Sequence, residues 1–197
     1  MSEHDRNHWE EAYACHSGIL AGPAPFLADH FHLLQPGRTL DLAAGSGRNA
    51  SFLAERGHRV LAADVARVAL RQLRRRSRAV DVVQVDLERP CFRIASFDNI
   101  VCINFLDRAL FPAMLRWLRP GGALLVDTFL VDQREVGHPR NPAFLLGHNE
   151  LLERLREARV LRYREGAVVD ESGTSYRAGI VVMRAPVQKL TSHGAPA

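Results

Sequence analysis

Residues 40–50 read LDLAAGSGRNA, and this stretch decides the fold. The apolar run from Thr39 to Ala44 is typical of a short buried strand, and the apolar residues after the Gly-Ser-Gly turn recur at helical spacing. Glycines at a strand-to-helix turn leave the backbone open to a ligand, and the free N–H groups of the helix start point into the same crevice. The stretch therefore predicts a ligand site at the carboxyl end of this strand.

A second signal lies nineteen residues beyond Gly45. There the next apolar run, Val60 to Ala63, ends in Asp64. A carboxylate on the tip of the neighbouring strand accepts hydrogen bonds from a ribose diol in dinucleotide-binding folds. The two signals together predict a site for a nucleoside-containing cofactor.

Composition bounds the class of protein. The chain has 197 residues, 47% of them apolar and 24% charged, which is ordinary for one soluble globular domain. Its net charge of +4 does not by itself imply nucleic acid. The three cysteines fit no zinc or CxxC spacing, so we expect no metal and free thiols in a reducing compartment. With neither a signal-peptide core nor a run of membrane-spanning length, the expected location is the cytoplasm, without a membrane partner.

The expected organisation has three parts: an N-terminal helical cover (1–37), a main domain (38–187) and a flexible tail (188–197). Within the cover, residues 3–16 are expected to form a polar helix with Trp9 and Tyr13 on one face. That face is either a small apolar anchor or a lid that brings Tyr13 to the substrate.

The rest of the chain alternates strand and helix patterns. Expected strands after the first are 59–64, 80–87, 97–105, 123–129, and a closing hairpin of about 160–169 and 175–185. A helix is expected from Asn149 to about Glu157, and residues 130–148 are expected to form a functional loop. The order predicts a doubly wound α/β fold, a mostly parallel sheet with an antiparallel end.

Several functions fit the glycine turn at this point. The spacing Gly45-x-Gly47-x-x-Ala50 satisfies the dinucleotide fingerprint, so an NAD-dependent oxidoreductase is one interpretation, although no second domain follows and the chain closes in a hairpin. A non-catalytic nucleotide-binding module is another. An RNA methyltransferase would use the arginine stripe of the helix after Asp64, which holds Arg71, Arg74 and Arg75, although such stripes are more often solvated surface.

A larger set of motifs resembles one family. It extends over about residues 38–185 and comprises Asp41-x-Ala43-x-Gly45-x-Gly47, Asp64, Val85-Asp86, Phe97-Asp98 and Leu118-Arg119-Pro120-Gly121-Gly122. Together these motifs resemble the class I S-adenosylmethionine-dependent methyltransferases. Within that superfamily, residues 45–49, 85–87 and 144–155 look like the tellurite-resistance methyltransferase group.

The resemblance implies a Rossmann-like, seven-stranded sheet whose last strand is antiparallel, with S-adenosylmethionine across the tips of the first four strands. Gly45 and Gly47 would line the methionine moiety, Asp64 the ribose, Asp86 and Leu87 the adenine, and Asn104 the reactive end. The full set of expected cofactor-binding residues is Asp41, Ala43, Gly45, Gly47, Arg48, Asn49, Asp64, Val65, Asp86, Leu87 and Asn104.

Two departures from the family pattern matter. Ala43 stands where the motif usually has its first glycine. The hairpin region 166–170 lacks the histidine that tellurite-processing relatives would offer, which favours another acceptor.

Methyl transfer from a sulfonium requires a nucleophile held in line and the exclusion of water. A nearby cation raises the population of a charged nucleophile, and Arg177 is the expected catalytic residue. Arg134, Arg140 and Tyr13 are expected to face the substrate. The expected acceptor is a small molecule, namely a thiol, a chalcogen oxyanion or a related metabolite, and we expect no nucleic-acid partner and a monomer or homodimer.

Overall fold

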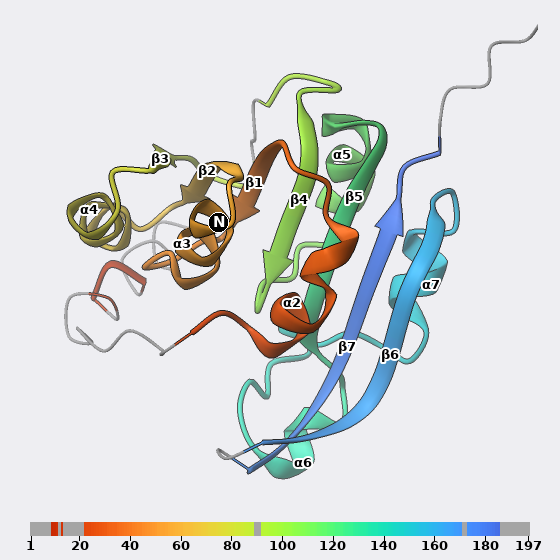
Figure 1. Cartoon of the computed structure of the whole chain (residues 1–197). Coiled ribbons are helices and arrows are strands. Elements are labelled where there is room, and N and C mark those ends of the chain that lie inside the picture. Colours follow the sequence, from red (N-terminus) through yellow and green to blue (C-terminus); the bar gives the residue numbers. More distant parts are fainter. Residues whose placement is uncertain (1–8, 12, 14–21, 89–91, 171–172, 186–197) are drawn as a thin grey trace, which may run out of the picture.

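The computed structural model describes residues 9–11, 13, 22–88, 92–170 and 173–185. Seven strands form one sheet in the order β3-β2-β1-β4-β5-β7-β6 (Figure 1). The strands are β1 (Arg38–Leu42), β2 (Arg59–Asp64), β3 (Val80–Gln84), β4 (Phe97–Ile103), β5 (Leu118–Phe129), β6 (Arg159–Asp170) and β7 (Gly173–Met183). The pairs among β1 to β5 are parallel, and β7 is antiparallel to both β5 and β6. The expected doubly wound sheet with an antiparallel last strand is confirmed.

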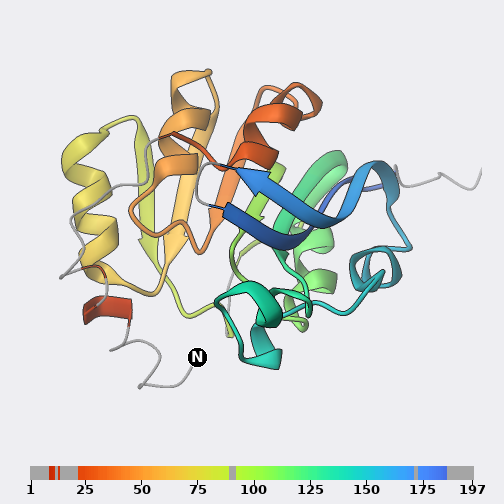
Figure 2. The ribbon, with the colours of Figure 1, turned by 90° about the horizontal axis from the view of Figure 1, so that it is seen from below.

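Helices cover both faces of the sheet. On one face lie α2 (Pro25–His30), its 3-10 extension η1 (Phe31–Leu33) and α3 (Arg48–Glu55), and on the other lie α5 (Leu110–Trp117) and α7 (Glu150–Arg154) (Figure 2). Leu73 of α4 (Arg67–Arg76) packs in the same core as Phe26 of α2 and Leu53 of α3. The connection after β5 holds α6 (Gln133–Val136) and the 3-10 turn η2 (Pro142–Phe144).

Side chains of each strand alternate between two cores. In β5, Leu124 and Val126 join the core beneath α5 and α7, whereas Ala123 and Leu125 join the core beneath α2 and α3. All four are buried, because a parallel sheet with helices on both faces leaves neither face to water. This burial explains the near-continuous apolar runs in the sequence.

The connection from Leu130 to His148 is folded back on itself. Leu130 and Leu146 form a parallel β-bridge. The Arg108 guanidinium donates to the carbonyl oxygens of Ala143 (3.1 Å) and Leu145 (2.7 Å) and so fastens the returning part. The expected loop is therefore a braced structure.

Several predicted boundaries differ from the structure; for example, the strand expected at 97–105 ends at Ile103. The helix that follows Asn149 ends at Arg154 and not near Glu157, and the Asn149 side chain does not cap it. Instead, the Glu150 carboxylate accepts the Gly147 N–H at 2.9 Å. β3 ends at Gln84, and β5 begins already at Leu118. Most of the expected 3–16 helix and the expected 188–197 tail lie outside the described residues, and within those residues no helix is long and apolar enough to span a membrane.

Candidate functional site

A cavity of about 260 Å³ opens where β1, β2 and β4 end. Eight of the residues expected to bind a cofactor line it: Ala43, Gly45, Arg48, Asn49, Asp64, Val65, Leu87 and Asn104. Tyr13, expected to face a substrate, lines it too. The lining also includes five residues that the sequence did not single out as ligand contacts: Trp9, Ala44, Ser46, Ile103 and Phe105.

The two glycines of the turn are needed for different reasons. Gly45 (φ +54°) and Gly47 (φ +83°) both have left-handed backbone conformations, which glycine adopts without strain. A Cβ on Gly45 would overlap the Tyr13 hydroxyl, whereas a Cβ on Gly47 would overlap the Leu73 side chain of α4. Gly47 is not among the residues lining the cavity, so its small size serves the packing of the turn against α4.

Ala43 is the strained residue of this turn. It occupies the left-handed region (φ +53°), which costs an alanine roughly 1–2 kcal/mol. This is the position where the family pattern has a glycine, and the conformation explains that preference.

Asp64 fastens the turn to the end of β2. Its Oδ2 accepts the Gly45 N–H at 2.7 Å, and its Oδ1 accepts the Ala66 N–H at 2.8 Å. Burial raises the pKa of this carboxyl, and the backbone N–H groups of Ala66 and Gly45 oppose that rise. Asp64 lines the cavity, and its carboxylate keeps acceptor capacity for a ligand.

Asp41 lies beneath the turn and does not line the cavity. It is 1% exposed, and its Oδ2 has no hydrogen-bond partner among the described residues. Burial and the neighbouring Asp64 charge raise the pKa of Asp41 to about 7, while the Ala50 N–H and Arg48 act in the opposite direction. A cation bound above the turn would complete the surroundings of this carboxyl.

Arg48 and Asn49 begin α3 at the cavity wall. Arg48 makes no hydrogen bond or ion pair with the part of the chain that the structure describes, and burial together with the charge of Arg177 lowers its pKa. The Asn49 Oδ1 accepts the Ala24 N–H at 2.9 Å, which ties the segment before α2 to the site. Arg48 is thus a half-buried cation available to an anion.

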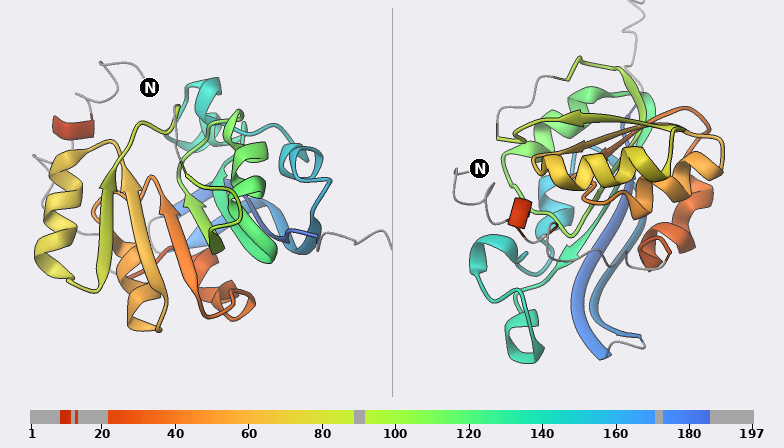
Figure 3. Two further views of the ribbon diagram at one scale, coloured as in Figure 1. Left: turned by 90° about the horizontal axis from the view of Figure 1, so that it is seen from above. Right: turned by 90° about the vertical axis from the view of Figure 1, so that its left-hand side faces the viewer.

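The N-terminal segment docks on α4 and forms part of the cavity wall. The Glu10 carboxylate accepts the N–H groups of Arg67 (2.8 Å) and Val68 (2.9 Å) at the start of α4, beside which the segment lies (Figure 3). Gln72 donates from Nε2 to the Tyr13 carbonyl oxygen at 3.0 Å. Burial and the nearby Asp64 raise the pKa of Tyr13 to about 12. Trp9 and Tyr13 therefore both line the cavity.

A charged network lies behind Asn104, outside the lining of the cavity. Arg177 donates from Nε and Nη2 to Asp127 Oδ2 (2.9 and 2.7 Å) and from Nη2 to Asn104 Oδ1 (2.6 Å). Arg164 donates to the other oxygen of Asp127 at 3.1 Å. Asp127 is 2% exposed and was not anticipated from the sequence, where it appears as one polar residue inside an apolar strand.

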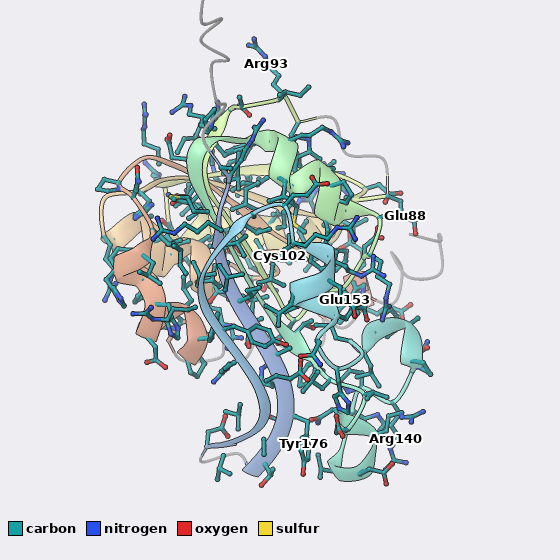
Figure 4. The ribbon with its side chains drawn as sticks, turned by 90° about the vertical axis from the view of Figure 1, so that its right-hand side faces the viewer. Glu88, Arg93, Cys102, Arg140, Glu153 and Tyr176 are labelled. Atoms are coloured by element: carbon teal, nitrogen blue, oxygen red, sulfur yellow. The ribbon has the colours of Figure 1, made fainter. Side chains whose placement is uncertain are left out.

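Besides Asp41 and Gly47, four further expected site residues do not line the cavity. Arg177 does not line the cavity and reaches it only through Asn104. Arg134 and Arg140 are exposed, and Figure 4 shows Arg140 on the outer side of its loop. Asp86 does not line the cavity, and its Oδ1 accepts the Glu88 N–H of its own turn at 3.0 Å. No cluster of metal-ligating side chains occurs among the described residues.

Comparison with known proteins gives the following relationships. Residues 39–122 match the family described as "Methyltransferase domain". The chain is 32% identical over 163 residues to the cypemycin N-terminal methyltransferase of a Streptomyces species, covering 72% of this chain and 64% of the relative. This chain therefore spans less than two thirds of that relative's length.

Solved structures share the fold. One is the 1,6-didemethyltoxoflavin-N1-methyltransferase of Burkholderia thailandensis with bound 1,6-didemethyltoxoflavin and S-adenosylhomocysteine (TM-score 0.68, 22% identity, 94% of this chain and 91% of that one). Another is TehB from Haemophilus influenzae (TM-score 0.71, 20% identity, 89% and 67%).

Proposed function

We propose that this chain, whose fold is that of the S-adenosylmethionine-dependent methyltransferases, transfers a methyl group from S-adenosylmethionine to a small-molecule nucleophile. The observation that carries the proposal is the cavity at the carboxyl ends of β1, β2 and β4, where the glycine turn, Asp64 and Leu87 meet. A fold alone does not fix a reaction, so the argument rests on these residues.

The residues present fit the cofactor. Its amino-acid end carries an ammonium and a carboxylate. The partnerless oxygen of Asp41 and the half-buried Arg48 supply charges of the opposite signs near the glycine turn. The Asp64 carboxylate retains acceptor capacity for a ribose diol. Leu87 and Val65 offer apolar contacts suited to an adenine. Asp86, which the family resemblance also implied for the adenine, does not line the cavity.

When bound, the cofactor supplies an electrophilic methyl group, so the protein has to position the acceptor and exclude water. Trp9 and Tyr13 form the cover on one side. No residue of the braced 130–148 connection lines the cavity, so the described cover consists of the short segment that carries Trp9 and Tyr13. A cover of this size suits a small acceptor better than a folded macromolecule. The motifs at 45–49 and 85–87 support kinship with the tellurite-resistance methyltransferase group, but the hairpin without a histidine favours a thiol or another small anion over tellurite.

Because Cys102 is a free, buried thiol, we also propose a reducing compartment, the cytoplasm.

The test is a ligand-dependent shift in thermal unfolding. A ligand at 100 times its Kd stabilises by about 2.7 kcal/mol. For a chain of this size that corresponds to a rise in Tm of roughly 5–10 °C. S-adenosylmethionine and S-adenosylhomocysteine should each give this rise, and NADH should give none. A shift with NADH alone would favour the oxidoreductase interpretation. The reversed β7 between β5 and β6 already differs from the usual dinucleotide-binding strand order.

The RNA alternative is tested separately. Arg71, Arg74 and Arg75 are all exposed on α4. Replacing the three by glutamine should leave turnover of a small acceptor unchanged. If RNA were the substrate, its binding would be tight at low salt and would fall steeply as salt rises.

A further inference from the structure

Asn104 lines the cavity, and its side-chain amide can present either an oxygen or an NH₂ group there. Asn104 follows β4 in the left-handed conformation (φ +57°), and its N–H donates to the Asp127 carbonyl oxygen at 2.9 Å. Asn104 is exposed, and it is one of the residues that line the cavity.

Arg177 decides how the amide is turned. A guanidinium has only donors, so the Asn104 atom 2.6 Å from Arg177 Nη2 has to be the oxygen. The other arm of the planar amide, the Nδ2 group, then points away from Arg177. It has no hydrogen-bond partner in the described part of the chain, and it faces the cavity as a pair of donors.

Arg177 is itself held in place. It donates twice to Asp127, a carboxylate that also accepts from Arg164, and its guanidinium lies over the Phe129 ring at 4.3 Å. Its side chain is 13% exposed. A charged group with these contacts does not turn to face a ligand, so it acts through the amide that it orients.

Few of the other polar residues that line the cavity could bind a cation beside Asn104. Asp64 is the one carboxylate among the described lining residues. It stands at the end of β2, with both oxygens already accepting backbone N–H groups. Asn49 has its oxygen engaged by Ala24.

We propose that Arg177 is a positioning residue that makes Asn104 present its NH₂ group, so that the site selects acceptors with a carboxylate, oxyanion or carbonyl beside the reacting atom. The inference rests on the proposed function and deepens it. It replaces the expectation that Arg177 is a catalytic residue, and it disfavours amines as acceptors.

The first experiment observes the amide directly. The side-chain ¹H–¹⁵N pair of Asn104 is identified by its loss in Asn104→Asp. Protein saturated with S-adenosylhomocysteine is then titrated with 3-mercaptopropionate or cysteamine, two thiols of similar length with opposite tail charges. The carboxylate probe should shift the Asn104 pair and cysteamine should not. A shift with cysteamine, or with neither probe, would overturn the proposal.

The second experiment replaces the hydrogen-bond donor that Asn104 presents to the cavity by an acceptor. Asn104→Asp keeps the shape and the contact with Arg177 but presents an oxygen to the cavity. The affinity for 3-mercaptopropionate relative to that for cysteamine should fall at least about tenfold, because a charge-assisted hydrogen bond to the carboxylate is replaced by repulsion between two carboxylates. Arg177→Gln should abolish this discrimination, and Arg177→Lys, which still donates to Asp127 and Asn104, should restore part of it. Arg140→Gln, which removes an exposed charge of the same sign, is the control and should leave the ratio unchanged.

If Arg177 had a purely structural role, its replacement would lower the affinity for both probes equally. That result would contradict the proposal. Failure of the proposed function would look different, since S-adenosylhomocysteine would then not bind in calorimetry. The titration of the unliganded protein would still report the orientation of the Asn104 amide.

Discussion

The Asp64 carboxylate accepts the Gly45 N–H at 2.7 Å, so the end of β2 holds the turn that follows β1. A side chain that the sequence marks only as a ligand contact therefore also shapes the ligand site. Loss of this carboxylate should affect both the fold and the binding of the cofactor.

For Asp64→Ala we expect two effects. Two backbone N–H groups lose their acceptor, and each buried donor left without a partner costs about 1–3 kcal/mol, so the free energy of unfolding in urea should fall by about 2 kcal/mol or more. The affinity for S-adenosylhomocysteine in calorimetry should fall at least about tenfold. Asp86→Ala is the comparison, because it removes a carboxylate that does not line the cavity. Equal losses of affinity in both variants would contradict our assignment.

Ala43→Gly should stabilise the protein. The left-handed conformation of Ala43 costs roughly 1–2 kcal/mol, and the greater freedom of glycine in the unfolded chain offsets about 0.5–1 kcal/mol of the gain. Ala44→Gly, at a buried neighbour without a positive φ, should instead destabilise. Urea unfolding of both variants measures the contrast, and a loss of stability in Ala43→Gly would show that the strain is absent.

Glu10→Gln should weaken cofactor binding while leaving the core intact. The carboxylate accepts two N–H groups at the start of α4, and an amide has one oxygen to offer them. Trp9 and Tyr13 would then be less firmly placed against the cavity. The measurement is the Kd for S-adenosylhomocysteine alongside the Tm of the free protein. Glu11→Gln, at the adjacent exposed carboxylate, should change neither quantity.

Cofactor affinity should depend on pH through Asp41. With a pKa of about 7 in the free protein, Asp41 is largely neutral below that pH. A bound sulfonium and ammonium favour its ionised form and lower its pKa in the complex. Affinity for S-adenosylmethionine should therefore fall as pH drops below 7, by up to about tenfold per unit, with proton release on binding. S-adenosylhomocysteine, which lacks the sulfonium, should show a weaker dependence. In Asp41→Asn the profile should be flat, and a flat profile in the unaltered protein would refute the assignment.

The sheet could be predicted from the sequence because its signals are local. The glycine turn, the apolar runs and the closing hairpin each depend on residues adjacent in the chain. The glycine turn and Asp64 could be placed at one site in the same way, since parallel strands end at one edge, whereas Leu87 was expected there only from the family resemblance.

Contacts between distant residues could not be predicted. Nothing in the sequence pairs Asp127 with Arg177 or Glu10 with the start of α4, because these contacts depend on how strands and segments pack. Gly47 fits the motif of a ligand turn, yet its small size is required by Leu73, a residue of another helix. Arg134 and Arg140 were expected at the site because of their charge, and charge alone does not say which way a loop side chain points.

The reversed direction of β7 has a consequence for how this protein can change. Gly45, Asp64 and Leu87 lie at or just beyond the ends of β1, β2 and β3. Arg177 comes from the far end of the chain, and it lies near them because a reversed strand begins where its parallel neighbours end. The groups that we propose to hold the nucleoside and those that we propose to select the acceptor therefore come largely from separate stretches of the sequence. Exchange of the β6–β7 hairpin for that of a related enzyme should therefore alter the choice of acceptor and leave the binding of the nucleoside unchanged. The two properties can then change independently of each other.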